Sequence, residues 1–408
     1  MKDADSGFNQ VLFWSCVKVK IAIVTNRFYP EVGGAETNIY FQACSLAKQH
    51  EVSVFCPKRI DAPDYEKLSG FELFRLKDWK NRKGEYPNIK TETLMPAVFF
   101  KIFTGSYDVV MYFPALSKNN MLGFIAAKLS GKKNVLCCFD WLDYSKIMHQ
   151  TGDIDPNIME RQEAKWYQKF FLKRFDYIFA ISNKEIEFFK KYNSSVGYSP
   201  VPIRLEEYDN FDAPNPREKY GIREDEFVFL SLGRVCKIKG QDIALKAFAK
   251  AAGKVSEAKL VFVGRQDYDP QITSEMKALI EENGLKDRVL FTGMVDREEV
   301  IGWLRHSDIH VIPVRFMNSG AVVVESWISG TPVLQSDVVD PNLVEEGVNG
   351  YNFRRADVDH LAEKMEKAFR NRADFPELAS TGEKLVREKY TYEYLTNLYI
   401  NTFKSLTD

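Results

Sequence analysis

The sequence predicts an α/β protein of two domains, each with a mainly parallel sheet that is covered by helices on both faces. Short apolar runs rich in β-branched residues alternate along the chain with stretches of helical spacing, which is typical of parallel sheets. A length of 408 residues fits two such domains, and 45% hydrophobic with 28% charged residues is an ordinary globular composition. The stretch Ser-Pro-Val-Pro at 199–202 breaks the pattern and marks the boundary between the domains.

The N-terminus and the cysteines indicate the cellular setting. We expect residues 1–17 to be a loose extension, since the apolar residues at 11–14 are too few and their neighbours too acidic for a signal peptide. No apolar run reaches the roughly 18 residues of a membrane span. The six cysteines form no CxxC pair and the five histidines form no metal pattern. We therefore expect reduced thiols and a cytoplasmic protein.

Charge is divided unevenly along the chain. The net charge of −1 argues against a general nucleic-acid binder, but residues 1–203 carry 28 Lys and Arg against 22 Asp and Glu, whereas residues 204–408 carry 28 against 35. A basic first half fits an anionic membrane surface or an acidic acceptor, and it equally fits two domains that differ only in solvated charge. The basic segment 77–90 and the aromatic-rich segment 94–103 pose a similar choice. They form either an interfacial membrane contact or, as we favour, a solvated loop before a core helix.

The first half opens with a strand at 20–25 and a loop at 26–36. Pro30 delays the next helix, and Gly33-Gly34 allows a ligand to approach the backbone before that helix starts near Ala35. Further strands are expected at 52–56, 71–76, 109–113, 135–139 and 177–182. Asp140 follows the fifth of these six strands at its carboxyl end, where open α/β sheets bind their ligands. Asp140 would either accept a proton or hydrogen-bond a substrate there, or cap the next helix; His149 lies nine residues further on.

The second half begins with a strand at 228–232 and the loop Gly233-Arg-Val-Cys-Lys-Ile-Lys-Gly240. Arg234 supplies a forked guanidinium and Lys239 a point ammonium, two groups that together suit a diphosphate. The helix that follows carries an apolar stripe, and strands are expected at 260–264, 289–293 and 309–314. His306 and His310 are interpreted as structural residues.

The segment 309–353 contains a second phosphate-binding pattern. A strand at 309–314 leads through a loop to a helix at 320–329, for which Ser319 is the expected N-cap. The free N–H groups of Gly320, Ala321 and Val322 would lie at the carboxyl end of the strand and favour an anion, phosphate above all. Glu325 lies about one and a half turns inside the helix, and Gly330 ends it before a strand at 333–336.

These motifs resemble the nucleotide-sugar site of the family 4 glycosyltransferases. The resemblance rests on Gly-Gly-Ala-Glu after the first strand, on the Gly-Arg and Lys-Gly loop, and on Ser-Gly-Ala followed by Glu325 and Gly-Thr-Pro-Val. It covers roughly residues 18–405. It implies the GT-B fold, in which two Rossmann-like, doubly wound domains face each other across a cleft. The expected division is 18–203 for the acceptor domain, 204–389 for the nucleotide-sugar domain and 390–408 for a helix that returns to the first domain.

The resemblance also implies a chemistry. The family transfers a sugar from a nucleoside diphosphosugar with retention, without a metal or another cofactor, by a front-face mechanism in which the leaving diphosphate accepts the acceptor's proton. Arg234 and Lys239 would stabilise charge on the β-phosphate, and Glu325 would bind the ribose. The catalytic candidates are Arg234, Lys239, Glu325 and Asp140. The donor-binding candidates are Gly33, Gly34, Gly233, Gly264, Val295, Met317, Ser319, Gly320, Ala321 and Val322.

Two positions depart from the family pattern. Met317 stands where the first glutamate of the two-glutamate motif belongs, and Asp140 stands where a histidine is common. We infer that nucleotide binding is kept and that the sugar or the acceptor is unusual. A non-catalytic GT-B subunit that binds nucleotide or glycan is the alternative, and a nucleotide-sugar epimerase is a third reading. By analogy the acceptor is a glycan, a lipid-linked saccharide or a small molecule, in polysaccharide or glycolipid assembly, with possible membrane association through the basic first domain.

Overall fold

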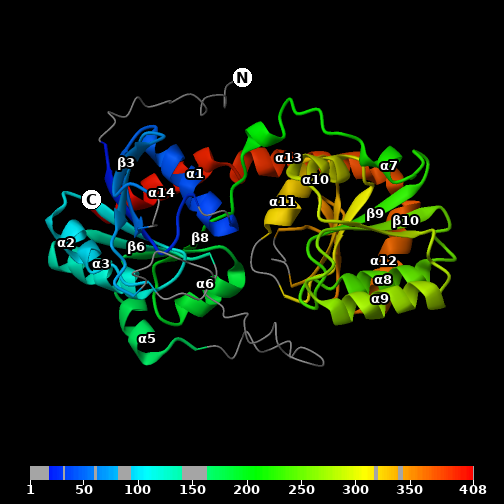
Figure 1. The fold of residues 1–408 in the computed structure, drawn as a ribbon, viewed down its shortest axis with the longest axis horizontal. Helices are drawn as coiled ribbons and strands as arrows, with labels where there is room; N and C mark the ends of the chain where they lie inside the picture. The colour runs from blue at the N-terminus through cyan, green and yellow to red at the C-terminus, as the bar shows by residue number, and fades with distance from the viewer. Residues whose placement is uncertain are drawn as a thin grey trace, which may run out of the picture.

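The computed structural model describes residues 18–30, 33–58, 62–80, 93–139, 163–316, 320–338 and 343–407. Two sheets, each flanked by helices, lie side by side in two lobes (Figure 1). The predicted fold class is confirmed, including two mainly parallel sheets and a C-terminal helix on the first of them. Within the described residues, no helix combines the length and the apolarity that crossing a membrane requires.

The first sheet has eight strands in the order β3-β4-β2-β1-β5-β6-β7-β8. All neighbours are parallel except the antiparallel pair β3 and β4. The central strand β1 pairs Ile23 with Val54 on one side and with Met111 on the other, and all three side chains are fully buried. Helices cover both faces, which is why the central strands are continuous apolar runs. The strands are β1 (Lys20–Thr25), β2 (Glu51–Pro57), β3 (Tyr65–Leu68), β4 (Phe71–Leu76), β5 (Val109–Phe113), β6 (Lys133–Cys137), β7 (Tyr177–Ala180) and β8 (Val196–Tyr198).

Two helical layers enclose this sheet. Helix α1 buries Ile39 and Ala43 in the cluster on one face, and the C-terminal helix α14 buries Leu395 in the same cluster. Phe124 of α3 and Phe171 of α5 belong to the cluster on the opposite face. The helices are α1 (Gly34–Ala47), α2 (Ala97–Thr104), α3 (Lys118–Leu129), α5 (Trp166–Leu172), α6 (Asn183–Lys190) and α14 (Tyr392–Thr407).

The second sheet has six parallel strands in the order β11-β10-β9-β12-β13-β14. Its strands are β9 (Phe227–Leu232), β10 (Ala258–Val263), β11 (Val289–Gly293), β12 (Ile309–Ile312), β13 (Val333–Ser336) and β14 (Gly350–Phe353). The predicted apolar stripe of α8 is buried against the sheet, as Ile243 and Phe248 illustrate. The helices are α7 (Pro216–Lys219), α8 (Gln241–Ala251), α9 (Pro270–Glu282), α10 (Arg297–Arg305), α11 (Ala321–Ile328), α12 (Val358–Arg370) and α13 (Phe375–Lys389), with the 3₁₀ turns η1 (Leu205–Glu207) and η2 (Arg372–Asp374).

The chain crosses between the lobes twice, and the two crossings touch. Ile203 N donates to Tyr390 O at 2.8 Å, so the outgoing and returning segments lie side by side. Beyond this point α14 reaches α1 of the first lobe (Figure 1). Thr396 Oγ1 donates to Ser45 Oγ at 2.8 Å, and the hydroxyls of Ser199 and Tyr399 lie 3.0 Å apart. The returning helix is therefore held by packing and by buried hydrogen bonds, while the domain boundaries at 203/204 and 389/390 stay predictions.

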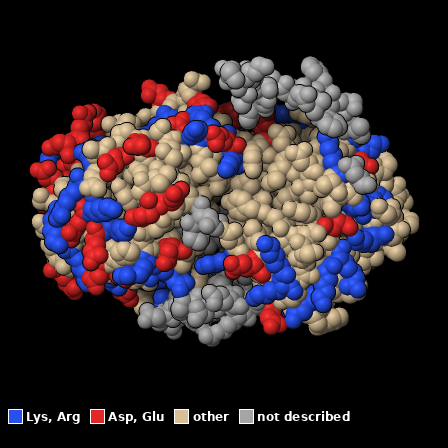
Figure 2. Space-filling model, turned by 180° about the vertical axis from the view of Figure 1, so that it is seen from behind, with Lys and Arg blue, Asp and Glu red and all other residues tan. Residues whose placement is uncertain are grey.

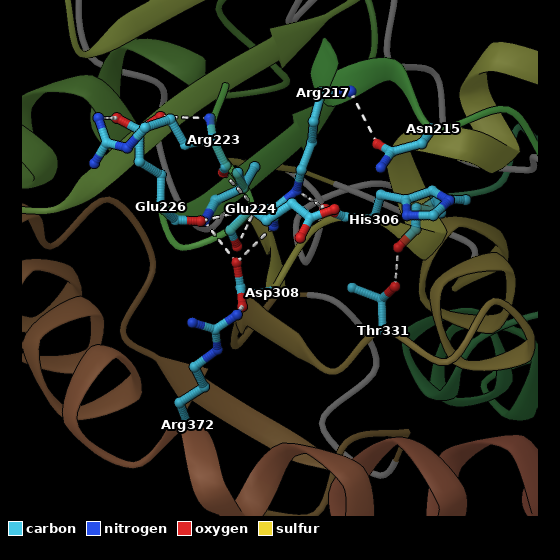
Figure 3. Close-up of polar contacts among 11 residues, drawn as sticks. Asn215, Arg217, Arg223, Glu224, Glu226, His306, Asp308, Thr331 and Arg372 are labelled. Carbon is cyan, nitrogen blue, oxygen red and sulfur yellow. Dashed lines mark hydrogen bonds and ion pairs between the residues drawn. The ribbon is translucent and has the colours of Figure 1, made fainter. Parts of the chain in front are cut away.

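A buried arginine organises the amino-terminal edge of the second sheet (Figure 3). Arg217 Nη1 donates to Glu226 O at 2.9 Å, Nε donates to His306 O at 2.6 Å, and Nη2 pairs with Asp308 Oδ2 at 3.0 Å. Arg372 pairs with the other oxygen of Asp308 at 2.7 Å. The network ties α7, β9, β12 and η2 together. Because ligands of open α/β sheets bind at the carboxyl ends of the strands, this network at the other end is structural.

Several predicted boundaries were wrong. The strands expected at 135–139, 177–182 and 309–314 end earlier, at residues 137, 180 and 312, and the short strands β3, β8 and β14 were not predicted. Residue Gly320, rather than Ser319, is the N-cap of α11, and Ser319 lies outside the described residues. Each missed strand has at most four residues, which is too short for a clear alternation of polar and apolar side chains.

Candidate functional site

A cavity of about 850 Å³ opens between the two lobes. Four predicted site residues line it: the donor-binding candidates Gly33 and Gly34 from the first lobe and Ala321 from the second, and the catalytic candidate Glu325. Asn26 and Phe139 are also in its wall, so the carboxyl ends of β1 and β6 face the cavity as expected for parallel sheets. Arg234, Lys239, Gly264 and Val295 are not among the residues that line it.

The glycine pair stands at the start of α1. Gly33 is the N-cap with φ −165°, an extended conformation open to any residue, so backbone strain does not explain the glycine. A Cβ at Gly33 would overlap the carboxylate of Glu36, which itself lies 3.8 Å from Arg27. At Gly34 no atom lies within 4 Å of where a Cβ would stand. The missing side chain of Gly34 therefore leaves open space beside the cavity, which is what a close approach by a ligand requires.

The loop between β9 and α8 brings Arg234 and Lys239 together. Both residues lie beside Gly233, whose φ of +122° few side chains tolerate. The exposed guanidinium of Arg234 lies over the ring of Tyr268, with 4.3 Å between Cζ and the ring centroid. Burial lowers the pKa of Lys239, and the charge of Arg234 lowers it further, against an opposing effect of Cys236. Because the charge of Arg234 already lowers the pKa of Lys239, an anion bound beside these two cations would be favoured.

The predicted residues Gly264 and Val295 lie in the two neighbouring loops. Gly264 N donates to Gly293 O at 2.9 Å, and a Cβ at Gly264, whose φ is +138°, would overlap the carbonyl of Gly233. The loops after β9, β10 and β11 are therefore packed backbone against backbone. Val295 is half-buried and packs against a core cluster of the second sheet, and its role in donor binding stays a prediction.

A hydrogen-bonded chain fixes the first turn of α11. His310 is buried on β12; its Nε2 accepts from Leu232 N at 3.3 Å, and its Nδ1 lies 2.7 Å from Ser326 Oγ. Ser326 Oγ in turn donates to Val322 O at 2.7 Å. Because Nε2 is an acceptor, Nδ1 carries the proton and the ring is neutral. Burial, with a smaller contribution from Lys239, lowers the pKa of His310 to about 3. The structural role predicted for His310 is confirmed, and it connects the end of β9 to α11.

An ion pair joins the two predicted phosphate-binding loops. Arg315, which leads toward α11, donates from Nη1 and Nη2 to the two carboxylate oxygens of Asp242 on α8, both at 2.7 Å. Arg315 N also donates to Ile238 O at 2.8 Å. Gly240, with φ +71°, packs so tightly on Pro313 that a Cβ would overlap its carbonyl. These contacts place the Lys239 loop against the segment that enters α11.

Glu325 has partners that the sequence did not reveal. Arg297 Nη2 lies 2.8 Å from Glu325 Oε1 and donates to the Tyr208 hydroxyl at 2.6 Å. Tyr208 OH donates to the same oxygen of Glu325 at 3.4 Å. Burial by itself would lower the pKa of the Arg297 guanidinium. The neighbouring Glu325 and Tyr208 outweigh burial and raise the pKa of Arg297 above its usual value. Glu207 of the crossing segment pairs with the same Arg297 nitrogen at 3.2 Å. Arg297 and Tyr208 both contact Oε1 of Glu325, whose side chain lines the cavity.

Some candidates lie outside the described residues. These are Asp140, His149, Met317 and Ser319, so their roles stay predictions. The structure describes Phe139 just before Asp140 and Phe316 just before Met317. Arg297 and Tyr208 were missed because neither occurs in a motif. An arginine at the start of a helix and a tyrosine in a crossing segment are common surface features, and only the fold brings them to Glu325.

Comparison with known proteins agrees with this geometry. Residues 32–202 match the model of the family described as Glycosyltransferase Family 4, and residues 212–385 match that described as Glycosyl transferases group 1. The chain is 24% identical to an uncharacterized glycosyltransferase of Methanocaldococcus jannaschii over 405 residues, which cover 95% of this chain and 98% of the relative. It is also 24% identical to the alpha-monoglucosyldiacylglycerol synthase of Streptococcus pneumoniae, over 78% of this chain and 70% of that protein.

A solved structure supports the fold. The Anabaena protein HepE, in complex with UDP, superposes with a TM-score of 0.69 at 17% identity, over 95% of this chain and all of that one. At this identity the likeness concerns the arrangement of the two lobes.

Proposed function

The chain belongs to the family 4 glycosyltransferases and has their GT-B fold, and from this we propose that it transfers a sugar from a nucleoside diphosphosugar to an acceptor hydroxyl with retention. The observation that carries the proposal is the coupling of two anion-binding elements. Arg234 and Lys239 share one loop, and the contacts of Arg315 and Gly240 hold that loop against the segment that enters α11. The relatives that bear a function in their names are glycosyltransferases, which favours this reading over a non-catalytic subunit.

In this proposal the protein acts by stabilising charge. As the bond from the sugar to the diphosphate breaks, negative charge grows on the β-phosphate, and the Arg234 guanidinium and the Lys239 ammonium stabilise it. The N–H groups at the N-terminus of α11 add a favourable field. The bond from the acceptor oxygen to the anomeric carbon forms on the same face, and the acceptor's proton goes to the departing diphosphate. No protein nucleophile or metal is needed for this step.

Glu325 is proposed as the ribose ligand. A carboxylate accepts hydrogen bonds from a vicinal diol, and Glu325 lines the cavity from α11. The contacts of Arg297 and Tyr208 with one oxygen orient the carboxylate and leave the other for the ligand. This arrangement makes Arg297 a positioning residue for nucleotide binding.

The transferred sugar and the acceptor are proposed to be unusual, because Met317 and Asp140 replace the family residues on the sugar side. A lipid-linked acceptor is our first choice, because the streptococcal relative is named for a glycolipid product. The test is to compare donor preference in the wild type and in Met317→Glu. An unchanged preference would count against a role for Met317 in sugar selection.

Thermal unfolding with UDP, GDP, ADP and their sugar conjugates tests the donor site. A nucleotide at 100 times its dissociation constant stabilises the protein by about 2.7 kcal/mol. We expect one nucleotide to do so, and Arg234→Ala to weaken its binding by about 3 kcal/mol, the scale of a lost oxyanion-stabilising group. Arg223→Ala is the matched control, since Arg223 is an exposed arginine at the opposite end of β9. Stabilisation by no nucleotide, or an equal loss in both variants, would refute the assignment of the diphosphate site.

A further inference from the structure

A buried hydrogen-bond network fixes the side chain of Asn26 in the first-lobe wall of the cavity. Met95 N donates to Asn119 Oδ1 at 2.7 Å, so the other end of the fully buried Asn119 amide is the donor Nδ2. This Nδ2 donates to Asn26 Oδ1 at 2.9 Å, and Thr93 Oγ1 donates to the same oxygen at 3.3 Å. Both acceptor positions of Asn26 Oδ1 are therefore occupied, and the orientation of its amide follows from a backbone N–H group.

The nitrogen of the Asn26 amide remains available to a ligand. Asn26 lies at the carboxyl end of β1, is partly exposed and lines the cavity, and within the described residues its Nδ2 donates to no group. The half-buried ring of Phe139 belongs to the same wall. Sites for organic ligands combine such apolar surface with a few polar groups in fixed positions. Asn26 therefore offers an oriented N–H donor to a ligand oxygen that accepts a hydrogen bond.

The charged side chains of the described lining form pairs of opposite sign. One pair belongs to the first lobe, one to the segment that crosses between the lobes, and one to the second lobe. The pairs are Arg27 with Glu36, Arg204 with Glu207, and Arg297 with Glu325. Three cations thus face three carboxylates, and the described lining carries no net charge. On the outer surface, Figure 2 also shows both signs of charge, blue and red, where the two lobes meet.

This charge balance disfavours a phosphorylated group in the first-lobe half of the cavity. Arg234 and Lys239 lie outside the lining, and neither forms an ion pair with a carboxylate of the described residues, as suits groups that hold a diphosphate. A phosphate monoester carries a charge of about −1.5 to −2 at pH 7, and an enclosed charge needs a partner. In the cavity it would have to compete with a carboxylate for each cation. Hydroxyl groups donate and accept hydrogen bonds without disturbing the pairs.

We propose that the first-lobe wall of the cavity binds an uncharged sugar as the acceptor, and that Asn26 is a specificity-determining residue which donates from Nδ2 to one of its hydroxyl oxygens. Arg234, Lys239 and α11 all belong to the second lobe, which leaves this wall to the second substrate. The name acceptor rests on the proposed function, whereas the binding of an uncharged sugar beside Asn26 does not. For a lipid-linked acceptor, the reacting end is then a sugar without phosphate.

Saturation-transfer difference NMR on the full-length protein tests the proposal. The probes are the methyl α-glycosides of glucose, galactose and mannose, each compared with the 6-phosphate of the same sugar, and no nucleotide is present. We expect at least one methyl glycoside to receive saturation, and its phosphorylated counterpart to bind more weakly. Because no donor is present, a failure of the transferase proposal in the nucleotide-binding test would leave this result unaffected.

Matched variants separate recognition by Asn26 from weak binding elsewhere. Asn26→Asp keeps an oxygen for Asn119 and Thr93 but replaces the free N–H donors by an acceptor, so the dissociation constant of the bound glycoside should rise about tenfold. Asn26→Ser, which lacks the amide, should show a similar loss. The control is Asn283→Asp, which adds the same charge at an exposed amide that ends α9 in the second lobe. It should leave the dissociation constant unchanged.

Monodeoxy forms of the bound glycoside identify the hydroxyl that Asn26 contacts. Removal of that hydroxyl should weaken binding to the wild type about tenfold and binding to Asn26→Asp much less, because the variant has already lost the hydrogen bond. A merely structural role of Asn26 would weaken all the deoxy forms equally in the wild type and in the variant.

Three results would overturn the proposal. The first is that none of the methyl glycosides binds to the wild type. The second is that a sugar phosphate binds more tightly than the corresponding methyl glycoside. The third is that Asn26→Asp binds the glycoside as well as Asn283→Asp does, or that no deoxy form distinguishes Asn26→Asp from the wild type. Unchanged circular dichroism and thermal unfolding must accompany each variant, so that unfolding cannot account for a loss of binding.

Discussion

His310 should make the second domain lose stability at mildly acid pH. The ring is buried and neutral, accepting from Leu232 N and contacting Ser326 Oγ, and its pKa is lowered to about 3 by burial and by Lys239. In the unfolded chain the pKa is about 6.5. Between these values the unfolded chain binds a proton that the folded domain does not. The stability is therefore complete above pH 6.5 and is lost as the pH falls toward 3.

The size of the effect follows from the two pKa values. A pH of 5.0 lies about 1.5 units below the pKa of this histidine in the unfolded chain. Protonation of the unfolded chain therefore lowers the free energy of unfolding by about 2 kcal/mol. Other titratable groups also make the free energy of unfolding depend on pH. Comparing the wild type with His310→Gln, whose polar side chain does not titrate, removes their contribution. We expect the free energy of unfolding to fall between pH 7.5 and pH 5.0 by about 2 kcal/mol more in the wild type than in the variant.

Urea unfolding at both pH values gives these free energies from the midpoint and the slope. His306→Gln is the matched control, since His306 caps α10 and is only partly buried, so its removal should change the pH dependence less. An equal loss of stability in the wild type and in His310→Gln would refute the reasoning. It would mean that the histidine is either accessible to protons or charged in the folded domain.

Three further predictions concern the site. Bound diphosphate should raise the lowered pKa of Lys239, so nucleotide binding should take up a proton at alkaline pH and weaken as the pH rises further. Calorimetry in two buffers of different ionisation enthalpy measures this proton uptake, and Lys239→Met should abolish it. The wild type should bind a ribonucleotide about tenfold more tightly than the 2′-deoxynucleotide, and Glu325→Gln should lose that preference; equal preferences in isothermal titration would exclude Glu325 as the ribose ligand. Gly240→Ala should lower the free energy of unfolding in urea by about 3 kcal/mol or more, because the added Cβ would overlap Pro313 O. Gly221→Ala, at a similar φ with open space around it, should lower it by about 1 kcal/mol. Equal losses in the two variants would show that the Gly240 loop shifts to accommodate the Cβ.

The sequence alone determined much of this protein. The alternation of apolar runs predicted the two parallel sheets, and the stripe on 241–251 predicted the buried face of α8. Such predictions succeed because side-chain periodicity is a local property that burial in a sheet or helix enforces. The family resemblance predicted that the C-terminal residues would form a helix that returns to the first lobe.

Tertiary structure decided which side chains meet at the site. Arg315 and Asp242 are 73 residues apart, and their bidentate pair joins two loops that the sequence presented as separate motifs. Arg297 and Tyr208 reach Glu325 only because α10, η1 and α11 converge at one edge of the sheet. Periodicity carries no information about such pairs, since one arginine on a surface resembles any other until the fold supplies its carboxylate. Local sequence patterns therefore determine the helices and strands, whereas long-range packing determines which side chains contact each other at the site.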